Sequence, residues 1–123
     1  MKFKFKCDEQ SIENFLAVQL STYEREVFCV IFLDNSGHLI AVQKHFYGYS
    51  GEVMREVMRE VIMRAVYYNA KSVIFAHNHP SGNKEASSDD LEITKTLKEI
   101  LRAIDVDVVD HFVIAAGNAT SIL

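Results

Sequence analysis

Hydrophobic residues in this chain fall into short runs that predict buried strands. Residues 27–33 read Val-Phe-Cys-Val-Ile-Phe-Leu, an uninterrupted apolar run that is typical of a strand covered on both faces. Asp-Asn-Ser-Gly follows at residues 34–37 and is a strong turn signal, so the chain is expected to return as a hairpin. The segments expected to form strands are residues 27–33, 38–46, 72–76, 106–109 and 112–115.

A different spacing of apolar residues predicts helices between these strands. Residues 53–61 repeat a four-residue unit, which places Val53, Val57 and Val61 on one helical face. Glu60 precedes Arg64 by about one turn, where the two side chains can form an ion pair. Three helices are expected. The first is capped by Asp8 or Ser11 and ends near residue 20, and the others lie at residues 53–68 and 91–101. A loop is expected at residues 47–51 and a turn at residues 117–118. Helices interleaved with strands predict an α/β or α+β sandwich.

Size and charge narrow the classes of protein to consider. The chain has 123 residues, 49% of them hydrophobic, which suits one domain with its own core. Lys and Arg number 13 against 17 Asp and Glu, a formal net charge of −4. This balance disfavours nucleic acid as the main ligand, because such proteins usually present a basic face.

Location and assembly are expectations from the same composition. No apolar run reaches the roughly 18 residues of a membrane span, and the start, Met-Lys-Phe-Lys-Phe-Lys, lacks the apolar core of a signal peptide. Two cysteines, Cys7 and Cys29, imply no disulfide framework, and Cys29 is expected to be a buried thiol. We therefore expect a cytoplasmic protein without membrane contact. The alternating start predicts an edge strand open to pairing, which would allow a homodimer.

Two histidines after the apolar run at residues 72–76 are the strongest chemical signal. His77 and His79 lie two positions apart, so in a strand their side chains point to the same side. With Asp90 they form a set of three ligands that leaves a fourth position open, as in catalytic zinc sites. Zinc lowers the pKa of bound water toward about 7, so the set predicts an enzyme that would also need a nearby glutamate as general acid and base. Ser87 is suited to hydrogen-bond a developing oxyanion.

Helix capping explains part of this pattern without any metal. Ser87 and Asp90 precede an apolar-periodic run with the spacing of a capping box, with Ser87 as the N-cap and Asp90 at N3. Acidic residues also suit the first helical turn. Capping does not account for His77 or His79, and both roles are compatible for residues beside a helix start. Asp89 is the alternative carboxylate.

The sequence argues against two classes of enzyme that act on nucleic acids. HNH nucleases take their residues from separate parts of a ββα unit, so the consecutive string His-Asn-His at residues 77–79 is no indication of one. Nucleobase deaminases need His-x-Glu and Pro-Cys-x-x-Cys, and neither occurs in the chain.

His77-x-His79-Pro80 followed by Ser87-x-x-Asp90 resembles the signature of the JAMM (MPN-plus, JAB-domain) metalloproteases. The fuller string His-Asn-His-Pro-Ser-Gly resembles the RadC branch of that family. The resemblance runs from Tyr23 to the end of the chain, and its further matching segments are residues 25–28, 32–34, 59–60, 69–70 and 110–111. The chain departs from the family at Ala86 and Met58, where proline is usual; both are positional supports, which puts the rigidity of the loop in doubt more than the chemistry.

The resemblance implies a fold and a set of roles. The fold is a JAMM/cytidine-deaminase-like α/β sandwich, a mixed β-sheet flanked by helices, in one domain with an N-terminal extension at residues 1–22 and a metal-site core at residues 23–123. The roles are zinc binding by His77, His79 and Asp90, oxyanion support by Ser87, and proton transfer by Glu26 at the start of the first core strand. On sequence alone the rivals of Glu26 are Glu24, Glu52, Glu56 and Glu60.

The function implied is zinc-dependent hydrolysis of a peptide or isopeptide bond, with one zinc ion per chain and a peptide or protein as substrate. One alternative is a DNA-associated accessory role, which the historical naming of the RadC branch implies. The net charge counts against it, as does the lack of room for the helix-hairpin-helix-like region of longer RadC proteins. The other alternative is a non-catalytic interaction module, against which the complete ligand set counts. The sequence specifies no particular substrate.

Overall fold

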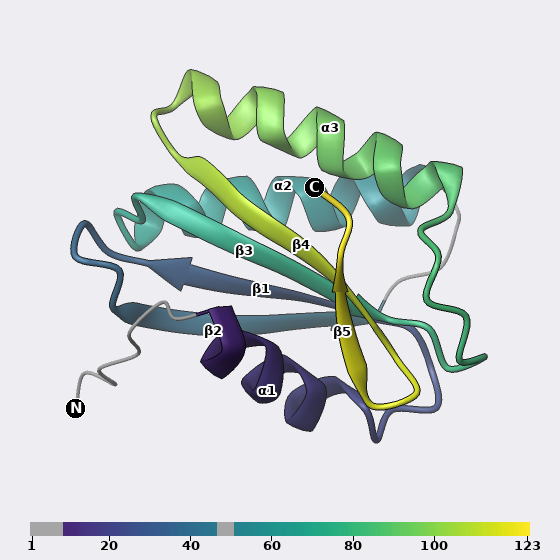
Figure 1. Cartoon of the computed structure of the whole chain (residues 1–123). Coiled ribbons are helices and arrows are strands. Elements are labelled where there is room, and N and C mark those ends of the chain that lie inside the picture. The colour runs from purple at the N-terminus through teal and green to yellow at the C-terminus, as the bar shows by residue number, and fades with distance from the viewer. Residues whose placement is uncertain (1–8, 47–50) are drawn as a thin grey trace.

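A computed structural model describes residues 9–46 and 51–123 of the chain (Figure 1). Its elements alternate between helices and strands along most of the sequence. In chain order they are α1 (Glu9–Leu20), β1 (Val27–Leu33), β2 (Leu39–Phe46), α2 (Gly51–Tyr67), β3 (Ser72–Asn78), α3 (Ser88–Ala103), β4 (Asp107–Ala115) and β5 (Asn118–Ser121).

The strands form one mixed sheet in the order β2-β1-β3-β4-β5. β3 and β4 run parallel, and the other neighbouring pairs are antiparallel. Figure 1 shows α2 and α3 on one side of the sheet and α1 on the other. The predicted α/β sandwich, with a mixed sheet flanked by helices, is confirmed.

The uninterrupted apolar run of β1 follows from its position between two cores. Phe28, Val30 and Phe32 pack with residues of α2 and α3, whereas Cys29 and Ile31 pack with residues of α1. Successive side chains of a strand point to opposite faces, so both parities must be apolar where both faces are covered. Cys29 is fully buried, as predicted.

The antiparallel pairing of β1 with β3 places the start of one strand beside the end of the other. Phe28 lies opposite His77 in this register, so the residues just before β1 and just after β3 meet at one edge of the sheet. The parallel partner β4 ends at the same edge, where the His79 N–H donates to the Ile114 carbonyl at 2.8 Å. Since α3 begins after the loop that follows β3, its N-terminus also lies near this edge.

Several predicted boundaries were wrong or incomplete. α3 begins at Ser88, directly after the predicted N-cap Ser87, so the helix predicted from the apolar run at residues 91–101 was too short. The two segments at residues 106–109 and 112–115 form the single strand β4, and the short strand β5 was not predicted. The predicted ion pair of Glu60 with Arg64 is confirmed, with 2.9 Å between Oε1 and Nε.

Some expectations fall outside the described residues. These are the Lys/Phe start at residues 1–6, with the edge strand and homodimer inferred from it, Cys7, the cap at Asp8 and the first four residues of the loop predicted at 47–51, whose last residue begins α2. The side chain of Val53 also lies outside the description. In the part of the chain that is described, no helix has both the length and the apolar character needed to cross a membrane.

Candidate metal centre

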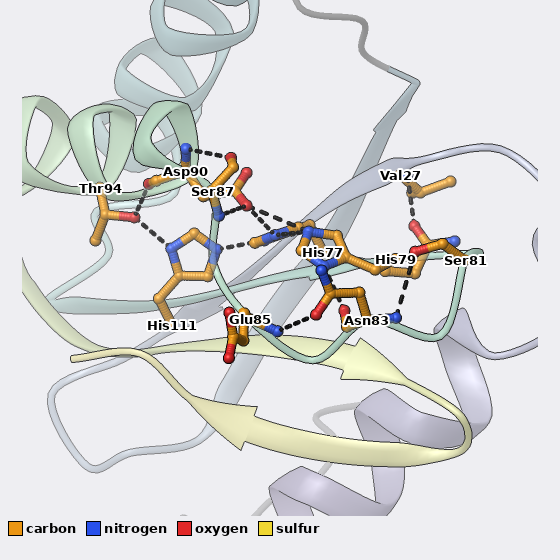
Figure 2. Close-up of polar contacts among 11 residues, drawn as sticks. Val27, His77, His79, Ser81, Asn83, Glu85, Ser87, Asp90, Thr94 and His111 are labelled. Carbon is orange, nitrogen blue, oxygen red and sulfur yellow. Dashed lines mark hydrogen bonds and ion pairs between the residues drawn. The ribbon is translucent and has the colours of Figure 1, made fainter.

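The structure brings His77, His79 and Asp90 together at the edge where β3 ends (Figure 2). Nε2 of His77 lies 3.0 Å from Nε2 of His79 and 3.1 Å from Oδ2 of Asp90. The same carboxylate oxygen lies 3.2 Å from Nε2 of His79. All three side chains are buried, so three electron-pair donors from the end of β3 and the start of α3 face one another away from bulk water.

The spacing and chemistry of these atoms suit a zinc ion. Zinc bonds to nitrogen and carboxylate oxygen are about 2.0–2.2 Å long, so ligand atoms of a tetrahedral site lie roughly 3.3–3.6 Å apart. The observed separations of 3.0, 3.1 and 3.2 Å approach that range within a few tenths of an ångström. Two imidazoles and a carboxylate are also a donor set that zinc accepts. The three residues are therefore a group that could hold a metal ion.

Asp90 is held by the start of α3 in the predicted capping box. The Asp90 N–H donates to Ser87 Oγ at 3.1 Å, and the Ser87 N–H donates to Asp90 Oδ2 at 2.9 Å. Burial raises the pKa of the Asp90 carboxyl, but the hydrogen bond and attraction to His77, with the Ser87 bonds, outweigh it and hold that pKa well below its usual range. The carboxylate is therefore ionised, and one oxygen serves both the helix cap and the candidate site.

The ring of His79 is oriented by the loop that follows it. Its Nδ1 lies 2.7 Å from the carbonyl oxygen of Asn83, which can only accept, so Nδ1 carries the proton and Nε2 is left for the site. The loop is braced by the Asn83 N–H donating to Ser81 Oγ and by the Glu85 N–H donating to Asn83 Oδ1. Loop structure beyond β3 thus fixes which nitrogen His79 presents.

His111 is a part of the site that sequence reasoning noted only as a point of family resemblance. It is fully buried on β4, with Nε2 2.7 Å from Nδ1 of His77 and Nδ1 2.5 Å from Oγ1 of Thr94 (Figure 2). Thr94 in turn donates to the backbone carbonyl of Asp90 at 2.7 Å. A histidine at the start of a predicted apolar strand was the available signal, but only the pairing of β4 with β3 shows what it contacts.

Glu26 and Ser87 lie beside the candidate ligands. Both line a cavity of about 280 Å³ that His79 also lines. Glu26 immediately precedes β1 and is partly buried. Glu85 lines the same cavity and is a carboxylate that sequence reasoning did not weigh. The remaining lining residues are Ser81, Asn83 and Ala86.

The rival glutamates are placed elsewhere. Glu56 and Glu60 line a separate pocket with residues of β2. Glu24 lines a neighbouring cavity of about 470 Å³ that extends past His79 to the turn between β4 and β5. The side chain of Glu52 lies outside the described residues. By position, Glu26 is the predicted glutamate that shares a cavity with both His79 and Ser87.

Asn78 holds the segment that carries Glu26. Its Oδ1 accepts the Val27 N–H at 2.6 Å, and its Nδ2 donates to the Arg25 carbonyl at 2.9 Å and to the Tyr23 carbonyl at 3.3 Å. The backbone is therefore fixed on both sides of Glu26 by one buried side chain. In the sequence, Asn78 is only the middle residue of the string His-Asn-His, and nothing there indicates this role.

Comparison with known proteins identifies the family of the chain. Residues 7–123 match the family model of the RadC-like JAB domain. A UPF0758 protein of Cellvibrio japonicus is 43% identical over 111 residues, which are 90% of this chain and 49% of that protein. Another, of Chromobacterium violaceum, is 43% identical over 112 residues, 91% of this chain and 50% of that protein.

The chain thus spans about half the length of the curated relatives it matches, and their names state no activity. The match nevertheless covers almost all of the sequence and includes every residue of the candidate site. The resemblance to the RadC branch is confirmed, and the chain belongs to the family of RadC-like JAB domains.

Proposed function

We propose that this chain is a zinc-dependent metallohydrolase that cleaves a peptide or isopeptide bond. The observation that carries the proposal is the convergence of Nε2 of His77, Nε2 of His79 and Oδ2 of Asp90 within 3.2 Å of one another. This buried set lies beside a cavity that Glu26 and Ser87 also line. Metal ligands, a candidate base and a candidate oxyanion donor are thereby available at one place.

The catalytic role proposed for each residue follows from the position of its side chain. Zinc held by His77, His79 and Asp90 would supply a Lewis acid and a water molecule of lowered pKa. Glu26 accepts the proton of the attacking water on its carboxylate and passes it to the leaving amine. Ser87 Oγ already accepts the Asp90 N–H, so its hydroxyl hydrogen can be donated to the substrate carbonyl oxygen as charge develops there.

The lining of the cavity favours an acyl substrate over a phosphodiester. It includes the carboxylates of Glu26 and Glu85, and neither lysine nor arginine is found among its described lining residues. Phosphate groups are normally met by basic side chains or by clustered backbone N–H groups. A neutral amide bond can enter such a lining without the repulsion that a phosphate backbone would meet.

Paired measurements of metal content and hydrolysis test the proposal. Purified chain loaded with zinc is expected to hold one equivalent and to cleave members of a library of internally quenched peptides and lysine isopeptides. Glu26→Gln is expected to keep the zinc but lose at least about 100-fold in rate, since it removes the general base. Glu56→Gln, in the separate pocket beside β2, is the matched control and should act like wild type.

Two results would contradict the proposal. One is a wild-type chain that takes up no stoichiometric zinc. The other is a Glu26→Gln variant that hydrolyses the same probe as fast as wild type does.

A further inference from the structure

We propose that His111 is a positioning residue for the metal site. It holds His77 in the tautomer that carries its proton on Nδ1, so that the Nε2 lone pair faces the site. The inference deepens the proposed function and rests on it, since it takes His77 to be a metal ligand. A series of hydrogen bonds runs from Thr94 through His111 to His77 (Figure 2).

Thr94 fixes the first proton. Its Oγ1 lies 2.7 Å from the backbone carbonyl oxygen of Asp90, which accepts and cannot donate, so the single hydroxyl hydrogen points there. The same Oγ1 lies 2.5 Å from Nδ1 of His111. Because its own hydrogen is already used, Thr94 accepts at this contact, and Nδ1 of His111 carries a proton.

That proton determines the state of the other ring. A neutral imidazole has one N–H, so Nε2 of His111 is an acceptor. It lies 2.7 Å from Nδ1 of His77, which must therefore donate. Nε2 of His77 is then the nitrogen left to bind a metal, and it lies 3.0 Å from Nε2 of His79 and 3.1 Å from Oδ2 of Asp90.

The surroundings of His111 keep its ring neutral and fix its plane. The ring is fully buried and edge-on to Phe28 and Phe75, with both centroids 5.8 Å away. Burial of this kind disfavours the charged form of an imidazole. A doubly protonated ring would have only donors and would leave the His77 N–H without this acceptor.

The two candidate histidine ligands are therefore oriented by different means. Ligating histidines commonly donate to a carboxylate, a carbonyl or water, as His79 donates to the carbonyl of Asn83. His77 donates instead to a neutral imidazole that leads through Thr94 to the backbone of Asp90. Hydrogen bonds through His111 and Thr94 therefore link two of the three candidate ligands, His77 and Asp90. The relative position of these two ligands thus depends on the packing of β4 against α3.

Proton positions in the metal-free chain test the assignment directly. Imidazole nitrogen–proton correlation spectra at pH 8 are expected to show a proton on Nδ1 of His77, hydrogen-bonded to His111, whether or not Nε2 shares a proton with the Asp90 carboxylate. His111→Leu removes the acceptor, and we expect the proton to exchange between the two nitrogens. His111→Gln, whose Oε1 can accept in place of Nε2, is expected to restore the wild-type pattern. A wild-type His77 without a proton on Nδ1 overturns the proposal, whatever the chain does with zinc.

Zinc affinity, measured by competition with a chromophoric chelator, is the second readout. His111→Leu is expected to bind zinc about 10–100-fold more weakly than wild type, the usual cost of losing a residue that orients a ligand. His111→Gln should lie between the two. Phe112→Leu, a neighbour on β4 that packs in the core on the side of α1, is the matched control and should keep wild-type affinity.

The outcomes separate this proposal from the proposed function. Equal zinc affinity of His111→Leu and wild type contradicts the role of His111. If His111→Leu does not fold, Thr94→Val is used in its place, because this variant lacks the hydroxyl that fixes the His111 tautomer. A Thr94→Val variant with an unchanged His77 tautomer and unchanged zinc affinity contradicts the proposal. A wild-type chain that binds no zinc contradicts the proposed function instead, and the spectra of the metal-free chain still decide on His111.

Discussion

Strand β3 ends in two adjacent polar residues, one on each side of the sheet, and they have different partners. His77 lies on the side of α2 and α3, like Val73 and Phe75, and its ring meets the side chains that form the candidate metal site. Asn78 lies on the side of α1 and hydrogen-bonds to the backbone of the segment that leads into β1. One strand end therefore serves two structural tasks.

The difference shows how strand alternation can separate metal binding from the placement of a base. Ligand atoms must converge from several side chains, which requires a common face. Glu26 needs a fixed backbone, which one amide side chain on the opposite face provides through both a donor and an acceptor. Changes on the two faces should therefore affect different measurements.

The largest effect is expected on the His77 face. His77→Ala and His79→Ala each leave only two protein ligands, so we expect stoichiometric zinc to be lost, a larger cost than the about 100-fold that follows from removing a ligand's orienting partner. Zinc content after dialysis, together with competition titration, measures this. Retention of one tightly held zinc ion by either variant would show that the ligand set is wrong.

A smaller and different effect is expected on the Asn78 face. Asn78→Ala leaves the buried Val27 N–H without its acceptor, which should lower the free energy of unfolding by about 1–3 kcal/mol. Misplacement of Glu26 should lower kcat for the peptide probe by up to about 100-fold. Zinc affinity should stay within a few-fold of wild type.

Asn78→Asp sharpens this comparison. It keeps an acceptor for Val27 but loses the donors to the carbonyls of Arg25 and Tyr23, so its kcat should fall between those of Asn78→Ala and wild type. Parallel loss of zinc and of kcat in the alanine variant would mean that the two faces are not separable.

The smallest effect is expected at Cys29, on the α1 side of β1. Burial raises the pKa of this thiol to about 12, against the attraction of Lys44, so the folded state binds its proton more tightly than the unfolded state does. The contribution of this thiol to the free energy of unfolding is fully present below its unfolded-state pKa, near 9, and is lost as pH rises toward its folded-state pKa of about 12. Between pH 8 and 10.5 wild type should lose roughly 1–2 kcal/mol more of its unfolding free energy than Cys29→Ala does.

Urea unfolding at the two pH values measures this difference. Native alkylation gives a second check, with Cys7→Ser as background so that Cys29 is the only thiol. Reaction at pH 8 should be slow in the folded chain and fast in urea. Equal rates in both states would show that Cys29 is not held in the core.

The fold was predictable where the burial of an element produces a regular pattern of apolar residues in the sequence. β1 is apolar at every position because two cores cover it, and α2 shows a periodic stripe in which Val57 and Val61 are buried. β5 carried no such signal. Its sequence Asn-Ala-Thr-Ser is only partly buried, and its strand conformation depends on pairing with β4.

The candidate site was predictable to the extent that its residues are close in sequence. His77, His79 and Ser87-x-x-Asp90 form a readable pattern, and the capping box observed at α3 agrees with it. The roles of Asn78 and His111 were not readable, because each depends on which strand lies beside β3. An asparagine or histidine in an apolar run says only that some partner must exist.

The separations of these contacts along the chain have a consequence for the order in which the site assembles. His79 and Asp90 are 11 positions apart, whereas His77 and His111 are 34 apart and Val27 and Asn78 are 51 apart. Loop-closure entropy makes the longest of these contacts about 1.4 kcal/mol more costly to form than the shortest. The contact between His79 and Asp90 therefore costs the least chain entropy to form and the contact that holds the segment of Glu26 the most, so we expect loss of the Val27–Asn78 contact to impair the proposed catalysis before His79 and Asp90 separate.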